Sequence, residues 1–178
     1  KKIQFLSTAF DLESLGFLVK ELELEMLKVP SGEITNGPLL LAHAKTGCNL
    51  IVSTGMATMK EVEVALGVIA FGLLGFDEIS QLAFQQAYHS EAGKKVLKEK
   101  VTLLHCTTEY PAAIEDINLH AINSMRNSFG LKVGYSDHSA GITVPIAAAA
   151  LGAVLIEKHF TLDRSLPGPD HKASLEPS

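Results

Sequence analysis

Six short, unbroken apolar runs constrain the fold of this sequence more than any other feature. They occupy residues 3–9, 26–32, 49–55, 101–107, 131–137 and 153–160. Apolar and polar residues do not alternate within them, which is typical of strands that are buried on both faces of a parallel sheet. The runs are also too short for buried helices. We therefore expect each run to form a strand of a parallel sheet.

Helical patterns separate most of these runs, at residues 12–25, 58–74, 115–129 and 142–151. The second pattern begins with Thr58, and Glu61 follows at the spacing of a capping box. Repeated strand–helix units require right-handed crossovers and give an α/β fold. Residues 76–100 form an additional predicted helical segment between the third and fourth runs. We assign a structural role to it.

Nearly every run finishes in small hydroxyl, charged or histidine residues, as in STAFD, KVPSGE, STG, HCTTEY, YSDH and EKHF. A (β/α)8 barrel builds its active site at the carboxyl ends of its strands. A doubly wound sheet uses those ends only at its switch point. Six polar strand ends therefore favour a TIM (β/α)8-type barrel, with about six of the eight strands present. We expect residues 1–178 to form one partial barrel domain.

The composition disfavours two classes of partner for the chain, nucleic acids and membranes. The formal charge is −5, and a nucleic-acid-binding protein usually carries a basic excess. No apolar stretch reaches the ~20 residues of a membrane helix. Cys48 and Cys106 fit no zinc or disulfide framework, so we expect reduced thiols in a cytoplasmic protein. The sequence thus predicts neither a nucleic-acid partner nor a membrane partner.

The first candidate site is a group of hydroxyls around one lysine. Its members stand at or near strand ends: Thr8, Lys28, Ser31, Ser53, Thr107 and Ser136. Several neutral donors with one positive charge suit a phosphate. Serine and threonine also cap strands and helices everywhere, and this alternative stays open. Because the pattern GxxxxGK[ST] is absent, a small phosphorylated acid is favoured over a nucleotide.

The second candidate site is a pair of histidines, His138 and His159, each at the end of a predicted strand. Neutral imidazoles on neighbouring strand ends would suit a divalent metal with positions left open for water and substrate. The alternative is that each ring is a hydrogen-bonded histidine of the core. Neighbouring strand residues point to opposite faces, so if the histidines face inward, Asp137 and Lys158 do not. These two residues are then candidates for supporting the metal ligands or for structural pairing.

Residues 162–178 (LDRSLPGPDHKASLEPS) follow the last run and contain Asp170 and His171. The prolines around Gly168 predict an ordered loop. Active-site loops often have this form, but an ordinary surface loop has it too.

Six motifs taken together resemble the sialic acid synthases, which are also called N-acetylneuraminate synthases and whose relatives make legionaminic and pseudaminic acids. The motifs are KVPSGE, STGMATMKE, HCTTEYP, GYSDHSAG, IEKHFTLDR and LPGPDHKASLEP, and the resemblance covers essentially the whole chain. It implies a condensation of phosphoenolpyruvate with an N-acetylated amino sugar such as N-acetylmannosamine. The products would be a nine-carbon 2-keto acid and phosphate.

The resemblance also implies roles for particular residues. His138 and His159 would hold a divalent metal, Mn²⁺ or Mg²⁺, that polarises the aldehyde of the sugar. Phosphoenolpyruvate would lie at the lysine and hydroxyl group described above. Glu33, Tyr110 and Asp170 would contact the amino sugar, although the sequence does not identify the catalytic base.

The sequence departs from the family pattern in three ways. The family has two barrel strands before STAFD, and it has a last barrel helix and an antifreeze-like domain after SLEPS. Ala9 also replaces a proline that is usual in the family. We therefore expect the chain to be a catalytic fragment of a longer synthase, inactive by itself, whose full-length form is a homodimer.

Two alternatives remain open. A related synthase that acts on sugar phosphates would need basic residues for a second phosphate, and few stand near the strand ends. A non-catalytic relative of the same barrel, acting in polysaccharide or spore-coat biosynthesis, would not need the metal. Metal affinity separates this second alternative from the enzyme.

Overall fold

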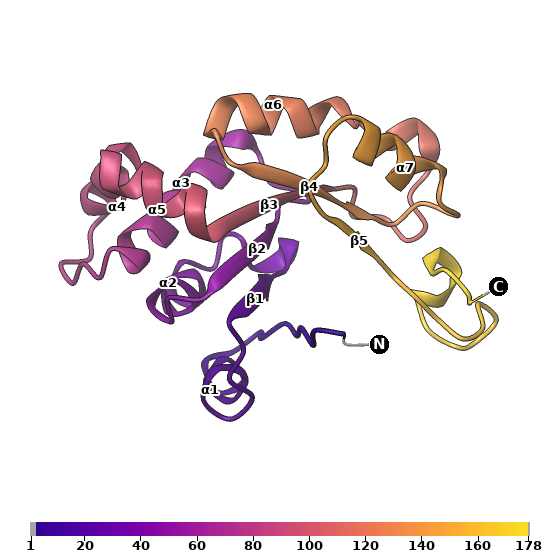
Figure 1. The fold of residues 1–178 in the computed structure, drawn as a ribbon, viewed down its shortest axis with the longest axis horizontal. Coiled ribbons are helices and arrows are strands. Elements are labelled where there is room, and N and C mark those ends of the chain that lie inside the picture. Colours follow the sequence, from indigo (N-terminus) through magenta and orange to yellow (C-terminus); the bar gives the residue numbers. More distant parts are fainter. Residues whose placement is uncertain (1–2, 178) are drawn as a thin grey trace. The chain divides into compact units, whose positions relative to one another are not determined.

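The structure is a computed structural model that describes residues 3–177, so residues 1, 2 and 178 of the expected domain lie outside it. Its contacts divide the chain into two compact units, of which the first ends at Thr102 and the second begins at Leu103. Each unit is an α/β assembly of parallel strands and helices (Figure 1). Among the described residues, no helix is long and apolar enough to cross a membrane.

The first unit contains two strands and five α-helices: α1 (Leu12–Lys20), β1 (Met26–Val29), η1 (Ser31–Glu33), α2 (Gly37–Lys45), β2 (Asn49–Ser53), α3 (Met59–Leu73), α4 (Gln81–His89) and α5 (Glu91–Lys100). β1 and β2 pair in parallel, with Lys28 opposite Ile51. After its first residue each strand is buried throughout, as the unbroken apolar runs predict.

Helix α3 begins as expected and forms much of the core of the first unit. Thr58 caps it, and the reciprocal bonds of a capping box with Glu61 are both present. Its buried residues cover most of its circumference because α2 packs on one side and α4 on another. Gly72 allows the close approach of α2, since a Cβ there would lie 2.6 Å from that of Ala44. The predicted helical excursion at 76–100 is α4 followed by α5.

The first apolar run does not become a strand. Residues 3–7 have no regular secondary structure, and Ile3 is 87% exposed. Only Thr8 pairs with the sheet, through an isolated parallel bridge to Lys28. Within residues 3–177 the structure has five strands and this single bridge, where about six strands were expected.

The second unit continues the alternation. It contains the remainder of β3 (Val101–Cys106), η2 (Ile114–Asp116), α6 (His120–Phe129), β4 (Lys132–Asp137), α7 (Thr143–Ala150), β5 (Ile156–Lys158) and η3 (His171–Ala173). Strands β3, β4 and β5 are neighbours in that order. Helix α6 lies along β4 (Figure 1), and its buried Ile122 and Met125 face the core. Gly130 ends α6 with φ of 67°, a left-handed conformation that glycine adopts without strain.

Strand β5 is short and exposed compared with β4. It pairs in parallel with β4, and Asp137 lies opposite Lys158. The chain then continues through Phe160, which bridges to Leu175, so that residues 162–177 return beside the strand end (yellow in Figure 1). The carbonyl of His159 accepts a bond of 2.9 Å from the amide of Leu175. This return holds the predicted loop against the end of β5.

Candidate active site

The polar strand ends form one cluster in each unit. In the first unit, the cluster centres on Lys28, which lies in β1 with only 7% of its surface exposed. Its ammonium group donates a hydrogen bond of 2.7 Å to Ser53 Oγ, at the end of β2. The parallel register brings these two strand ends together. The structure thus places a buried positive charge beside a serine hydroxyl, as the phosphate-site hypothesis requires.

Ser31, Glu33 and Thr8 belong to the same unit. Ser31 Oγ accepts a bond of 3.0 Å from the amide of Gly55, which fixes the turn after β2. Glu33 ends the 3₁₀ turn η1, where its Oε2 accepts a bond of 2.7 Å from Asn36. Thr8 reaches Lys28 through the backbone bridge. Of the residues predicted to contact phosphoenolpyruvate, this unit therefore contributes four, and of the predicted sugar contacts it contributes one.

In the second unit, His138 follows β4 and is 5% exposed. Its Nδ1 lies 2.7 Å from the carbonyl oxygen of Thr107, so this nitrogen carries the proton and donates it. Nε2 is then left as a lone-pair donor. Burial is the main cause that lowers the pKa of His138 below its ordinary value of 6.5, and the nearby His159 lowers it further. The ring is therefore neutral at pH 7, the form that binds metals.

His159, Tyr110 and Asp170 converge on this ring. The centroids of the His138 and His159 rings are 5.4 Å apart. The ring of Tyr110 stacks on His138 at 4.1 Å and meets His159 edge-on at 5.5 Å. Asp170 Oδ2 lies 3.8 Å from His159 Nδ1. Burial and the neighbouring negative groups raise the pKa of Tyr110, so its phenol keeps its proton. Two of the three predicted sugar contacts thus lie beside the predicted metal ligands.

Glu157 is also part of this cluster, although it was not among the predicted site residues. Its Oε1 accepts a hydrogen bond of 2.6 Å from Ser136 Oγ, a buried hydroxyl of β4. Ser136 Oγ also lies 3.5 Å from His138 Nε2. The alternation of the strand could have indicated Glu157, because it lies two residues before His159 and strand residues two apart share a face. A ligand anion at Ser136 would therefore share that hydroxyl with a carboxylate.

On the opposite face, Asp137 and Lys158 form an ion pair. Lys158 Nζ lies 2.6 Å from Asp137 Oδ2, and the two side chains are 9% and 0% exposed. An exposed pair such as Lys94–Glu91 contributes little to stability, because water and salt screen its charges. Removing one partner of a buried pair costs about 3–5 kcal/mol, because the other charge is left unpaired. Loss of one partner of the Asp137–Lys158 pair should therefore destabilise the protein more than loss of one partner of an exposed pair on a helix.

The histidine pair has the spacing that a shared cation requires. Two imidazoles bound through nitrogen at ~2.1 Å place their ring centres about 4.6–5.6 Å apart for angles of ~90–120° at the metal. The observed 5.4 Å falls within this range. Among residues 3–177, no group of three or more His, Cys, Asp or Glu side chains has the arrangement of a metal site. The distance between the ring centres is thus compatible with a cation held by the two histidines, with further positions left for water or substrate.

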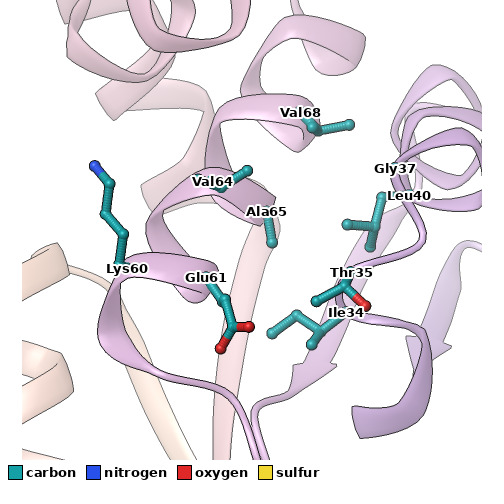
Figure 2. Close-up of a pocket in the computed structure, with 9 residues that line it drawn as sticks. All are labelled: Ile34, Thr35, Gly37, Leu40, Lys60, Glu61, Val64, Ala65 and Val68. Atoms are coloured by element: carbon teal, nitrogen blue, oxygen red, sulfur yellow. The ribbon is translucent and has the colours of Figure 1, made fainter. Parts of the chain in front are cut away.

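A separate apolar groove of about 160 Å³ lies between α2 and α3 in the first unit (Figure 2). Ile34, Leu40, Val64 and Val68 line it, with Glu61 at the rim (Figure 2). The carboxylate of Glu61 is engaged by Thr58 in the helix cap. Thr35 and Lys60 also line the groove, and Lys60 Nζ lies 2.6 Å from Glu63 Oε1. The groove is mainly aliphatic and its charged groups are already paired, so we place no reaction there.

Comparison with known proteins decides the family. The NeuB family model matches residues 1–178, the whole chain. The chain belongs to the NeuB family. A curated relative of this NeuB-family chain is the N,N'-diacetyllegionaminic acid synthase of Campylobacter jejuni, which is 50% identical over 175 residues. That match covers 98% of the chain but 46% of the relative, so the chain spans less than half the length of that protein.

Solved structures agree with this assignment. The N-acetylneuraminic acid synthetase of Leptospira borgpetersenii, crystallised with citrate, superposes with a TM-score of 0.76 and 38% identity. That match covers 96% of this chain and 50% of the synthetase. The phospho-2-dehydro-3-deoxyheptonate aldolase of Thermotoga maritima matches with a TM-score of 0.67 at 17% identity, over 96% of this chain and 45% of the aldolase, and this likeness concerns the fold alone. The fold is therefore an incomplete TIM-type barrel with parallel strands, as expected.

Proposed function

We propose that the chain is the catalytic core of a synthase that condenses phosphoenolpyruvate with an N-acetylated amino sugar and releases phosphate. The observation that carries the proposal is the convergence of His138, His159, Tyr110 and Asp170 in the second unit. Family membership supports the same reaction class, because the relatives are synthases of sialic and legionaminic acids.

In this proposal the two units divide the recognition of the substrates. Lys28 and Ser53 hold the anionic phosphoenolpyruvate, because a buried ammonium group beside a hydroxyl offsets its charge and donates hydrogen bonds to it. Thr8 and Ser31 complete this part. Thr107 and Ser136 are further proposed substrate-binding residues, and the Thr107 carbonyl also orients His138.

The amino sugar is proposed to lie at the histidine pair. His138 presents Nε2 as a lone-pair donor because Nδ1 donates to Thr107. Mn²⁺ or Mg²⁺ held by His138 and His159 would supply Lewis-acid polarisation of the sugar's carbonyl oxygen. Tyr110 covers one face of the His138 ring and limits the access of water from that side. Asp170 is the proposed carboxylate contact to the sugar at this pair, and Glu33 keeps its predicted role as a carboxylate that recognises the amino sugar.

The name of the Campylobacter jejuni relative carries two N-acetyl groups, which favours a 6-deoxy diacetamido sugar over N-acetylmannosamine. Because phosphoenolpyruvate is a cytoplasmic metabolite, we also propose that the enzyme acts in the cytoplasm. The full-length protein is proposed to be a homodimer, which sedimentation velocity would test.

The test is a coupled phosphate-release assay of the full-length protein with phosphoenolpyruvate and each candidate sugar, with and without Mn²⁺. We expect release that depends on the sugar and on Mn²⁺. His138→Ala should abolish turnover with the circular dichroism spectrum unchanged, whereas His120→Ala, at the exposed start of α6, should leave turnover intact. Turnover by His138→Ala would contradict the metal role. The absence of release with every sugar, together with no affinity for Mn²⁺, would favour the non-catalytic polysaccharide or spore-coat alternative.

A further inference from the structure

The feature that carries a further inference is the ring of bonds around Lys158, on the sheet face opposite the histidines. Lys158 Nζ lies 2.6 Å from Asp137 Oδ2 and also donates to the carbonyl oxygen of Ser139. Asp137 Oδ1 accepts from the amide and the hydroxyl of Ser139, at 3.1 and 2.7 Å. Lys158 is thus hydrogen-bonded to the residues directly before and after His138, which are Asp137 and Ser139.

This ring connects the two predicted metal ligands through the backbone. His138 lies between Asp137 and Ser139, and His159 directly follows Lys158. Asp137 and Lys158 lie opposite each other as the last paired residues of β4 and β5, and each histidine directly follows one of these strand ends. A shift of Lys158 relative to Asp137 would therefore change the separation between the imidazole rings.

The short length and the exposure of β5 explain why an ion pair is needed to hold it against β4. β5 has only three residues, and all of them are at least partly exposed. In the order of the sheet it stands last, after β4. A strand this short has few backbone bonds to fix its position. The buried ion pair is oriented by four hydrogen bonds, and it fixes β5 against β4 at the position next to the histidines.

We propose that the Asp137–Lys158 pair is a positioning device that sets the separation of His138 and His159, and with it the affinity of the site for a divalent cation. Neither side chain touches the metal or the substrate. This inference rests on the proposed function, in which the two histidines hold the cation. Changes to groups that orient metal ligands typically cost 10–100-fold in affinity, and we expect an effect of that size here.

The experiment measures the dissociation constant of Mn²⁺ for the full-length protein, from the electron paramagnetic resonance signal of the free ion. The variants are Lys158→Met, Lys158→Arg, and the double variant Asp137→Asn with Lys158→Met. The double variant leaves no unpaired charge, so it avoids the penalty that follows when only one partner of a buried pair is removed. Lys94→Met is the matched control, since it removes a lysine from the exposed ion pair with Glu91. The melting temperature of each metal-free variant is recorded in parallel.

We expect the double variant to regain the native melting temperature while its affinity for Mn²⁺ stays at least 10-fold below that of the native protein. Lys158→Arg keeps the charge and the donors, so it should recover most of the affinity. Lys94→Met should bind as the native protein does. A double variant that binds Mn²⁺ within 2-fold of the native protein would overturn the positioning role and leave the metal site standing. If His159→Ala binds Mn²⁺ as tightly as the native protein, the metal site itself is wrong and the inference falls with it.

Discussion

At the scale of single residues, burial gives one histidine a role in stability that has nothing to do with the candidate site. His43 lies in α2 with 1% of its surface exposed. Its Nδ1 is 2.9 Å from the carbonyl oxygen of Leu39, while Nε2 has no hydrogen-bond partner within the described structure. Burial lowers the pKa of His43 below 6.5, because the charged ring would lose its hydration.

This burial predicts a pH dependence of folding. Because the pKa of His43 is lower in the folded than in the unfolded protein, the unfolded chain binds the proton first as the pH falls. The contribution of His43 to the free energy of unfolding should therefore be complete above about pH 7 and should decline below pH 6.5, by at most ~1.4 kcal/mol per pH unit for this single group. Urea unfolding between pH 5 and 8 measures the slope, and His43→Leu should flatten it.

Ile69→Val is the control for that measurement, because it removes one methylene from the same unit at a fully buried position. It should lower the free energy of unfolding by about 0.5–1.5 kcal/mol at every pH and leave the slope unchanged. A slope that is the same in His43→Leu and in the native protein would contradict the prediction. His105, whose pKa is also lowered by burial, accounts for part of the slope that remains.

The sequence predicts which polar residues stand at strand ends better than it predicts the bonds between them. His138 and His159 could be identified because each ends an apolar run. Asp137 and Lys158 could be assigned to the other face from alternation alone, and the structure confirms their pairing. The bond from Ser136 to Glu157 could not be predicted, because it depends on the register between β4 and β5. A sequence pattern gives the face of a residue, whereas its cross-strand partner requires the pairing.

At the scale of elements, an unbroken apolar run predicts a strand most accurately where that strand is buried on both faces. The run at 49–55 became β2 with nearly the expected bounds, and Thr58 caps α3 as expected. The run at 153–160 shrank to the three residues of β5, and the run at 3–9 formed only the bridge at Thr8. Both lie where exposure is high, so an apolar run by itself did not ensure a strand there.

The close approach of β5 to β4 can be tested by a substitution at Gly134, a glycine of β4. A Cβ at Gly134 would lie 2.4 Å from the carbonyl oxygen of Leu155 and 2.7 Å from Leu104. We expect Gly134→Ala to force the strands apart and to lower the free energy of unfolding by about 1–3 kcal/mol. Chemical denaturation of the purified protein measures the change.

Gly16→Ala is the matched control for this substitution. Gly16 lies inside α1, and nothing lies within 4 Å of the position of its Cβ. The exchange should stabilise the helix by about 0.5–1 kcal/mol. If the two variants shift stability in the same direction, the close contact at Gly134 does not govern the packing of β5.

At the scale of the whole molecule, apolar surface is concentrated at particular segments. Val154, Phe160 and Leu162, before and after β5, are 58%, 65% and 82% exposed. An edge strand with apolar neighbours is a template for association with another chain. We expect the purified 178-residue chain to self-associate at micromolar concentration and to show no condensation activity, since it spans under half the length of the C. jejuni synthase.

Light scattering across a concentration series measures the association. Replacing Val154 and Leu162 by glutamate should reduce it, whereas Leu82→Glu, on the exposed face of α4, should have a smaller effect. A 178-residue chain that stays monomeric at all concentrations would contradict the expectation. Phosphate release by that chain would show that the missing length is not needed for the chemistry.

The stacking of Tyr110 on His138 has a practical consequence. The chain contains no tryptophan and three tyrosines, so its ultraviolet emission comes from tyrosine. One of these emitters lies 4.1 Å from a predicted ligand ring, centroid to centroid. A paramagnetic ion captured by the two imidazoles would quench that emitter at close range. The fold thus carries a built-in optical reporter at the place where the chemistry is proposed, and no label has to be attached to follow the arrival of the ion.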